Sequence, residues 1–312
     1  MEIRKTIYCL MLIGFVSNSI FAQLTQNRAH DPYQAKFVYQ DLKQFIKVYH
    51  TLTEDSDTIA IIQKDYLDKG SLGLKEFISK YNLTAKSMAR AMYKYPDSYS
   101  NIKDKLNALK LCERKFSKAA YNKIKVLIPS AEFPPTYYLV AGRRGIGSGS
   151  IAGPLISIEK DDIAEYYKGN VGTLVHEMIH MQQLRVLKKE YFTIFNEKKS
   201  LLSKSVREGV AEFYGQLISD FPSYKEQFLP YLNTHEKELW TAFTRDAKNR
   251  DFGDWYGKPN KAGQPNDLGY LIGLKMAEAY FNSSSDKQKA SEYLISIVDY
   301  EAFFLACGYN PE

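Results

Sequence analysis

The amino-acid sequence predicts an α+β fold that is mainly α-helical with a small β-ribbon or sheet. Apolar residues recur at helical spacing through much of residues 32–121 and again in the region after residue 171. Short runs rich in β-branched and aromatic residues, bounded by proline and glycine, are confined to residues 124–158. The length of 312 residues suits one large domain, for which we expect two lobes.

The segment 1–22 has the features of a secretory signal peptide. Arg4 and Lys5 form a basic start, residues 7–16 form an apolar run, and Ala22 supplies a small residue at the cleavage site. This apolar run is too short to span a bilayer comfortably, and no later stretch is long and apolar enough. We therefore expect cleavage before Gln23, export to the periplasm or the medium, and no stable membrane insertion.

Composition excludes some classes of partner and leaves one question about cysteines open. The formal net charge is +6, without any block of five like charges, and no nucleic-acid-binding module is recognisable, so we expect no nucleic-acid partner. The sequence contains no extended heptad pattern of the kind that predicts obligate assembly, so we expect a monomer. Cys112 and Cys307 lie outside any C-x-x-C pattern, and the sequence favours two buried thiols at least as much as one disulfide.

The region of about 28–122 reads as a helical scaffold lobe without chemistry of its own. Apolar side chains from Phe37 to Tyr49 recur at helical spacing, and a second set follows from Ile59 to Leu67. Further helices are expected to begin near Ser71 and Thr84, and a long one near residue 98.

A β-ribbon is predicted next, within a central region of about 123–221. The runs Ile124–Ile128, Thr136–Ala141 and Leu155–Ile158 have strand composition, and the glycine-rich segment 142–150 separates the last two. A strand, a glycine turn and a returning strand would make a hairpin. The glycine spacing does not predict a phosphate-binding loop, because no Lys-Ser/Thr pair and no helix follow it.

The strongest chemical signal is the pattern H-E-x-x-H at residues 176–180. On a helix, His176 and His180 lie one turn apart on the same face, with Glu177 beside them. Two imidazoles can then bind one metal ion while the carboxylate serves as a base. This spacing predicts a catalytic zinc site.

A catalytic zinc usually has three protein ligands, so a third must come from elsewhere in the chain. The remaining histidines, His30, His50 and His235, are in no local pattern typical of a metal site. Glu208 and Glu212 lie four residues apart on the next helical pattern, and we expect Glu208 to be the third ligand. Glu212 would then accept a hydrogen bond from the far nitrogen of a ligand imidazole.

The last region, about 222–312, is predicted to be a second helical lobe. One helix begins near Thr234, and a loop with Trp255 and Tyr256 occupies residues 250–264. Asp267 is a candidate cap for the helix that follows.

His176–His180 together with Glu208–Glu212 resembles the gluzincin metallopeptidases. The segments Thr136–Gly142 and Asp267–Gly273 resemble a narrower set, the predicted zinc-dependent proteases related to the gliding-motility lipoprotein B family. The resemblance implies a single peptidase domain over residues 23–312, with zincin-like active-site helices between two helical lobes. It also implies that Tyr270 stabilises the oxyanion and that an edge strand beside the metal pairs with an extended peptide.

We therefore expect an exported metallopeptidase with one Zn²⁺ per chain, acting on a peptide or protein substrate. Glu177 would take a proton from the zinc-activated water as it attacks the peptide carbonyl. Two alternatives stay open: a cell-envelope binding or assembly protein that retains a zinc site, and a zinc hydrolase acting on a non-peptide envelope amide. The sequence identifies no substrate-binding residue and does not distinguish exopeptidase from endopeptidase action.

Overall fold

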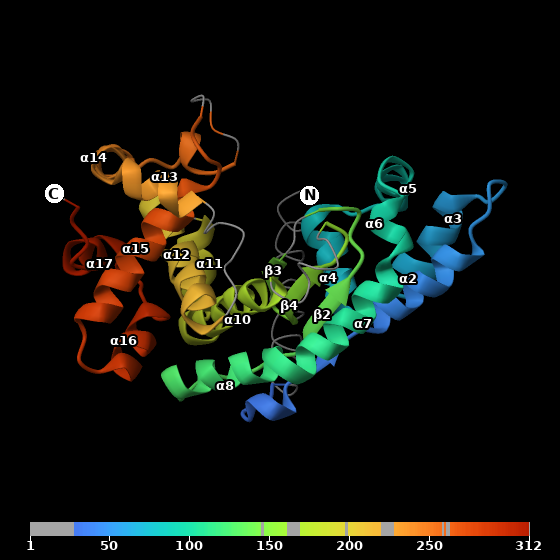
Figure 1. Ribbon diagram of the computed structural model, residues 1–312, viewed down its shortest axis with the longest axis horizontal. Helices are drawn as coiled ribbons and strands as arrows, with labels where there is room; N and C mark the ends of the chain where they lie inside the picture. The colour runs from blue at the N-terminus through green and yellow to red at the C-terminus, as the bar shows by residue number, and fades with distance from the viewer. Residues whose placement is uncertain are drawn as a thin grey trace, which may run out of the picture.

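The computed structural model describes residues 28–144, 147–160, 169–196, 199–219, 228–257, 259 and 263–311. The predicted signal peptide lies outside these residues. Within them the protein is mostly helical with one four-stranded mixed sheet, which confirms the predicted α+β class. The N-terminal helices lie on one side of the molecule and the C-terminal helices on the other, with the sheet and helix α10 (Gly169–Leu187) between them (Figure 1).

The N-terminal helices form close to where the sequence predicts them, except that Phe37 and Val38, expected in the first helix, form a short strand before it. Side-chain caps fix two of the starts: Ser71 Oγ accepts from Leu74 N, and Thr84 and Ser87 form a reciprocal capping box. The helices are α2 (Gln40–Thr51), α3 (Thr58–Ile61), α4 (Leu72–Tyr81), α5 (Ala85–Lys94), α6 (Asp97–Ser100), α7 (Ile102–Cys112) and α8 (Lys118–Leu127), with the 3₁₀ turn η1 (Pro32–Gln34) and the π-helical segments η2 (Ile62–Leu67) and η3 (Glu113–Ser117).

The predicted strand at Ile124–Ile128 is wrong, because most of this run lies in the last turns of α8. Its β-branched residues suggested a strand, but Ala120, Tyr121 and Ile124 recur at helical spacing and are all buried in one core. Packing of this helical face outweighs the local strand preference.

The sheet contains the two other predicted strands, but they are not paired as a hairpin. Strand order is β1 (Phe37–Val38), β2 (Thr136–Leu139), β4 (Gly153–Ser157) and β3 (Gly147–Ser150). β2 and β4 are parallel, and the glycine-rich segment itself supplies β3, which pairs antiparallel with β4. The expected hairpin is therefore replaced by a mixed sheet with β3 at its edge.

The C-terminal helices follow α10. They are α11 (Lys189–Asn196), α12 (Leu201–Ile218), α13 (Leu229–Thr234), α14 (Glu236–Asp246), α15 (Leu268–Ser283), α16 (Lys287–Leu294) and α17 (Tyr300–Ala306), with the turn η5 (Gly253–Trp255) in the aromatic loop. Asp267 precedes α15, as predicted, but its carboxylate does not cap that helix and instead accepts from Gly257 N at 2.8 Å.

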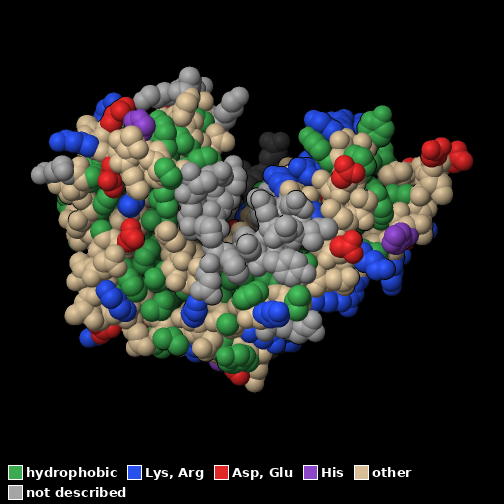
Figure 2. Space-filling view, viewed as in Figure 1, with side chains coloured by type: hydrophobic (Ala, Val, Ile, Leu, Met, Phe, Trp, Pro, Cys, Tyr) green, Lys and Arg blue, Asp and Glu red, His purple; other side chains and the backbone are tan. Residues whose placement is uncertain are grey.

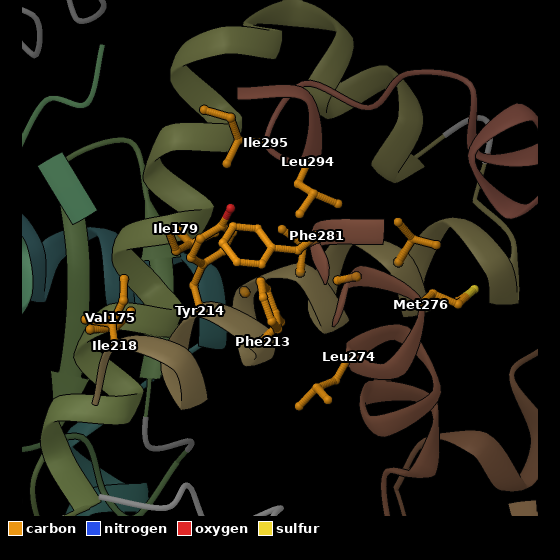
Figure 3. Packing of buried hydrophobic residues seen from close by; sticks show 14 of the residues in the cluster. Val175, Ile179, Phe213, Tyr214, Ile218, Leu274, Met276, Phe281, Leu294 and Ile295 are labelled. Carbon is orange, nitrogen blue, oxygen red and sulfur yellow. The ribbon is translucent and has the colours of Figure 1, made fainter. Parts of the chain in front are cut away.

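Two hydrophobic cores flank the centre of the molecule. One joins α2–α7 to the sheet, and the other joins α8, α10, α12 and the helices from α13 onward. In the second core the apolar faces of α10, α12 and α15 meet around Ile179, Phe213 and Phe281 (Figure 3). Cys112 and Cys307 are both buried free thiols. No helix among the described residues is long and apolar enough to cross a membrane.

Candidate metal site and active site

Three helices carry the predicted site residues. α10 carries the two histidines and Glu177, α12 carries both acids, and α15 carries Tyr270. Gly209 of α12 faces Gly273 of α15 so closely that a Cβ on either glycine would overlap backbone atoms of the other helix. This glycine contact allows α15 to lie against α12 at the level of Glu208.

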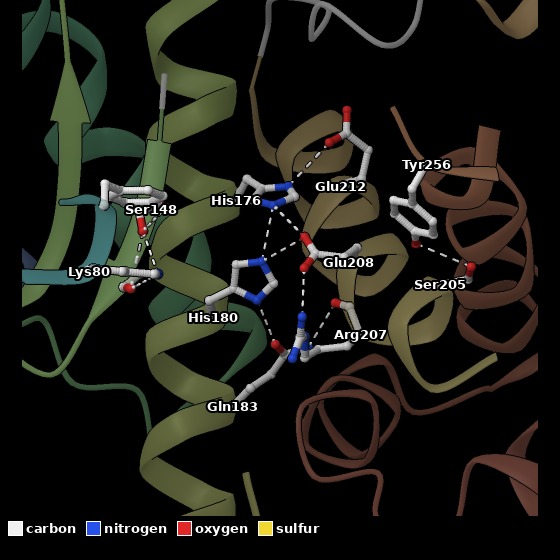
Figure 4. A network of polar contacts seen from close by, with 12 residues as sticks. Lys80, Ser148, His176, His180, Gln183, Ser205, Arg207, Glu208, Glu212 and Tyr256 are labelled. Atoms are coloured by element: carbon white, nitrogen blue, oxygen red, sulfur yellow. Dashed lines mark hydrogen bonds and ion pairs between the residues drawn. The ribbon is translucent and has the colours of Figure 1, made fainter. Parts of the chain in front are cut away.

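The structure brings His176, His180 and Glu208 together as a buried group that could hold a metal ion. The two Nε2 atoms lie 3.1 Å apart, and Glu208 Oε2 lies 3.2 Å from His180 Nε2 and 3.4 Å from His176 Nε2 (Figure 4). Ligand bonds of about 2.0–2.1 Å in a tetrahedral site place neighbouring ligand atoms about 3.3 Å apart. The three separations therefore fit one small cation.

The far nitrogens of both imidazoles face hydrogen-bond acceptors. His176 Nδ1 lies 3.1 Å from Glu212 Oε2, as predicted, and His180 Nδ1 lies 2.8 Å from Gln183 Oε1. The Gln183 amide is oriented by donating to Arg207 O at 3.2 Å. With the protons on Nδ1, both Nε2 lone pairs point at the Glu208 carboxylate, so three acceptors converge, as a bound cation requires.

Sequence reasoning missed two residues of this network, Gln183 and Arg207. A signal for Gln183 was present, because it lies three residues after His180 and thus on the same face of α10. Arg207 Nη2 donates to Glu208 Oε1 at 2.8 Å. Although burial alone would raise the pKa of the Glu208 carboxyl, imidazoles that donate to it from Nε2 in place of a bound cation, together with Arg207, hold that pKa well below its ordinary value.

Glu177 lies beside the metal group against strand β3. Its side chain is buried, and none of the described residues offers a hydrogen bond to its Oε2 atom. A Cβ at Gly147 would lie 2.5 Å from Glu177 Oε1, so any other residue there would require the Glu177 carboxylate to shift away from its present position. A buried carboxylate oxygen without a protein donor is suited to bind a water or a substrate group.

Tyr270 lies next to the metal group from the side of α15. Its ring centroid is 6.2 Å from that of His176 and 5.2 Å from that of Tyr256. The negative charge of Glu208, together with burial, raises the pKa of Tyr270 well above its ordinary value. The phenol therefore stays neutral and keeps a proton to donate.

The site opens into a cleft of about 590 Å³. The surface is hollowed between the N-terminal and C-terminal helices (Figure 2). The cleft is lined by Lys80, Tyr81, Gly147, Ser148, Gly149, Lys160, Gly172, Thr173, His176, Glu177, His180, Tyr191, Lys204, Arg207, Glu208, Glu212, Gly215, Asp267 and Tyr270. All six predicted site residues lie on it, so the catalytic, metal-binding and supporting candidates face one space.

Other histidines and cavities do not compete with this site. His30 is exposed near Glu132, His50 packs on Tyr49, and His235 Nδ1 lies 2.9 Å from Tyr231 O. A larger cavity of about 690 Å³ lies near the start of α12, but no histidine or cysteine lines it. Among the residues described, only His176, His180 and Glu208 form a metal-competent group.

Comparison with known proteins adds no relative: no family model, curated protein or solved structure matches this chain.

Proposed function

We propose that this chain is an exported zinc metallopeptidase, in which α10, α12 and the β3–β4 ribbon form a zincin-like active site between two helical lobes. The observation that carries the proposal is the convergence of His176, His180 and Glu208, with the Glu177 carboxylate beside them and lacking a described donor at Oε2. A purely structural metal site has no need of that fourth group.

His176, His180 and Glu208 would hold the zinc, and Glu212 and Gln183 would fix the orientation of the two imidazoles. A zinc ion bound there supplies Lewis acidity, which lowers the pKa of a water molecule and polarises a carbonyl oxygen. Two histidines and one carboxylate are a donor set typical of catalytic zinc.

Glu177 is the proposed general base. Its carboxylate accepts a proton from the attacking water and then delivers that proton to the leaving amine. Tyr270, neutral because its pKa is raised, donates a hydrogen bond to the oxyanion that forms at the former carbonyl.

Strand β3 is the proposed backbone-binding edge. It pairs with β4 on one side only, and it runs past Glu177. An extended peptide pairing with the other side would bring its carbonyl groups along the metal group. Lys80 and Tyr81 hold Ser148 of this strand through hydrogen bonds of 2.6 and 2.8 Å to its hydroxyl, which fixes the edge in place (Figure 4).

Elemental analysis of the purified protein tests the metal site. We expect about one zinc per chain in the parent and loss of zinc in both His180→Ala and Glu208→Ala. Hydrolysis of a mixed peptide library, with isolated cell-wall material as the comparison substrate, then tests the reaction. Failure to bind metal after reconstitution, or zinc retained by both variants, would overturn the proposal.

A further inference from the structure

A small side pocket adjoins the catalytic cleft, and its charged lining residues are all cationic. It has a volume of about 20 Å³, enough for one water-sized group such as one oxygen of a carboxylate. Its lining is Ile194, Lys199, Ser203, Lys204, Arg207 and Phe252. Lys204 and Arg207 also line the cleft, so the side pocket and the metal group share a wall.

Lys204 connects the side pocket to the reaction centre. It lies four residues before Glu208 on α12, and therefore one turn away on the same helix face. Its Nζ atom lies 3.6 Å from the ring centroid of Tyr256 and 4.6 Å from that of Phe252. Lys199 Nζ lies 4.4 Å from the same Phe252 ring. The aromatic faces hold both ammonium groups without neutralising them.

Arg207 is paired with Glu208, whereas the two lysines of the side pocket have no such close acidic partner. No acidic residue lines the pocket, and among the described residues no carboxylate lies within ion-pairing distance of Lys199 or Lys204. Burial lowers the pKa of Lys204, and repulsion from Arg207 and Lys199 lowers it further, against the opposing attraction of Glu208 and Asp267. An anion placed between these cations would relieve that repulsion.

We propose that the side pocket binds a carboxylate of the substrate, next to the bond that is cleaved. The inference rests on the proposed peptidase function and adds a substrate class to it. The carboxylate is either the C-terminus of a peptide or an Asp or Glu side chain, since both present the same group. Lys204 would be the main contact, with Phe252 and Ile194 packing against the adjoining methylene groups.

Two pairs of peptides distinguish the sources. One pair differs only in a free or amidated C-terminus, and the other only in Glu or Gln beside the scissile bond. In one of the two pairs we expect the anionic peptide to have a kcat/KM about tenfold or more above that of its neutral partner, mainly because its KM is lower. Lys204→Met, which keeps the apolar stem, should abolish that preference, Lys204→Arg should retain it, and exposed Lys237→Met should leave it unchanged.

Binding separates this inference from the proposed function. Calorimetric titration of the same peptides into the zinc-loaded Glu177→Gln protein, with and without Lys204→Met, measures affinity without turnover. Tighter binding of an anionic peptide that depends on Lys204 supports the side pocket even if the parent hydrolyses nothing, a result that would overturn only the peptidase. Two results would overturn carboxylate binding by the side pocket without affecting the proposed peptidase function. One is hydrolysis or binding with no preference for the anionic peptide in either pair, and the other is a preference that survives in a folded Lys204→Met protein.

Discussion

Glu177 is the residue on which the proposed chemistry depends most directly. It is not one of the three grouped ligands, so its role can be separated from metal binding. We expect Glu177→Gln to retain about one zinc per chain and to lower kcat by about 10²–10⁴-fold, because an amide cannot accept the proton. Elemental analysis and initial rates on the same sample check both parts.

Glu54→Gln, at an exposed position, is the matched control and should have the parent rate. Near-parent hydrolysis by a zinc-loaded Glu177→Gln protein would contradict the assignment of the base.

A second prediction at this scale concerns Glu212 and Gln183, which contact the two histidines on the side away from the metal group. Glu212→Ala and Gln183→Ala each remove the acceptor of an imidazole Nδ1–H group. Loss of such an acceptor typically weakens metal affinity about 10–100-fold, because the ring is no longer held in one tautomer and orientation. Competition with a chromogenic chelator measures the zinc dissociation constant. Parent affinity in both variants would show that these hydrogen bonds do not support metal binding.

These residues also show what local spacing can and cannot predict. His176, His180, Glu208 and Glu212 share helix faces, and the structure places them together as the H-E-x-x-H and E-x-x-x-E spacings suggest. The sequence did not predict a role for Arg207, because its contact with Glu208 depends on the rotamers of both side chains. Sequence spacing identifies a shared face but does not fix such rotamers.

At the scale of elements, the crossing of α12 and α15 depends on Gly209 and Gly273. A methyl group at Gly209 would overlap the backbone of α15, which cannot move aside as a flexible side chain can. We expect Gly209→Ala to lower the free energy of unfolding by about 3 kcal/mol or more, at the upper end for overpacking. Urea denaturation followed by circular dichroism gives the value.

Gly215→Ala in the same helix is the matched comparison, because its Cβ would meet Gly172 O at 3.2 Å, a contact that a small shift relieves. Its cost should be much smaller, since alanine also favours the helix by about 1 kcal/mol. Equal stability of the two variants would contradict the role given to the Gly209–Gly273 contact.

Strand β3 is the part of the sheet that the sequence pattern did not predict. The runs Thr136–Leu139 and Gly153–Ser157 are strands, but glycine has no side chain to produce an alternating pattern, so the sequence predicts a turn where β3 forms. Its glycine content reflects a tertiary constraint, the approach of Gly147 to Glu177. No local property of the segment carries that information.

At the scale of the molecule, the cleft is built from parts that are distant in the sequence. Lys80 and Tyr81 at the end of α4, strand β3, and Tyr270 of α15 face the metal group across it. Helical spacing predicted most of these helices, but their arrangement depends on how two separate cores meet around the sheet and α10. The residues of α4 that line the cleft were therefore not predictable from local sequence patterns.

Metal binding should stabilise the folded molecule through the same arrangement. His176 and His180 on α10 and Glu208 on α12 come together only in the folded chain, so a bound ion links two helices of the C-terminal core. Free zinc at a hundredfold excess over its dissociation constant would add about 2.7 kcal/mol to the free energy of unfolding. We expect removal of the metal by a chelator to lower Tm by several degrees in the parent, whereas His180→Ala should unfold at the same temperature with and without chelator. Differential scanning calorimetry measures both proteins. A Tm that is insensitive to chelator in the parent would mean that no metal links these helices, whereas an equal drop in His180→Ala would place the responsible ion elsewhere in the molecule.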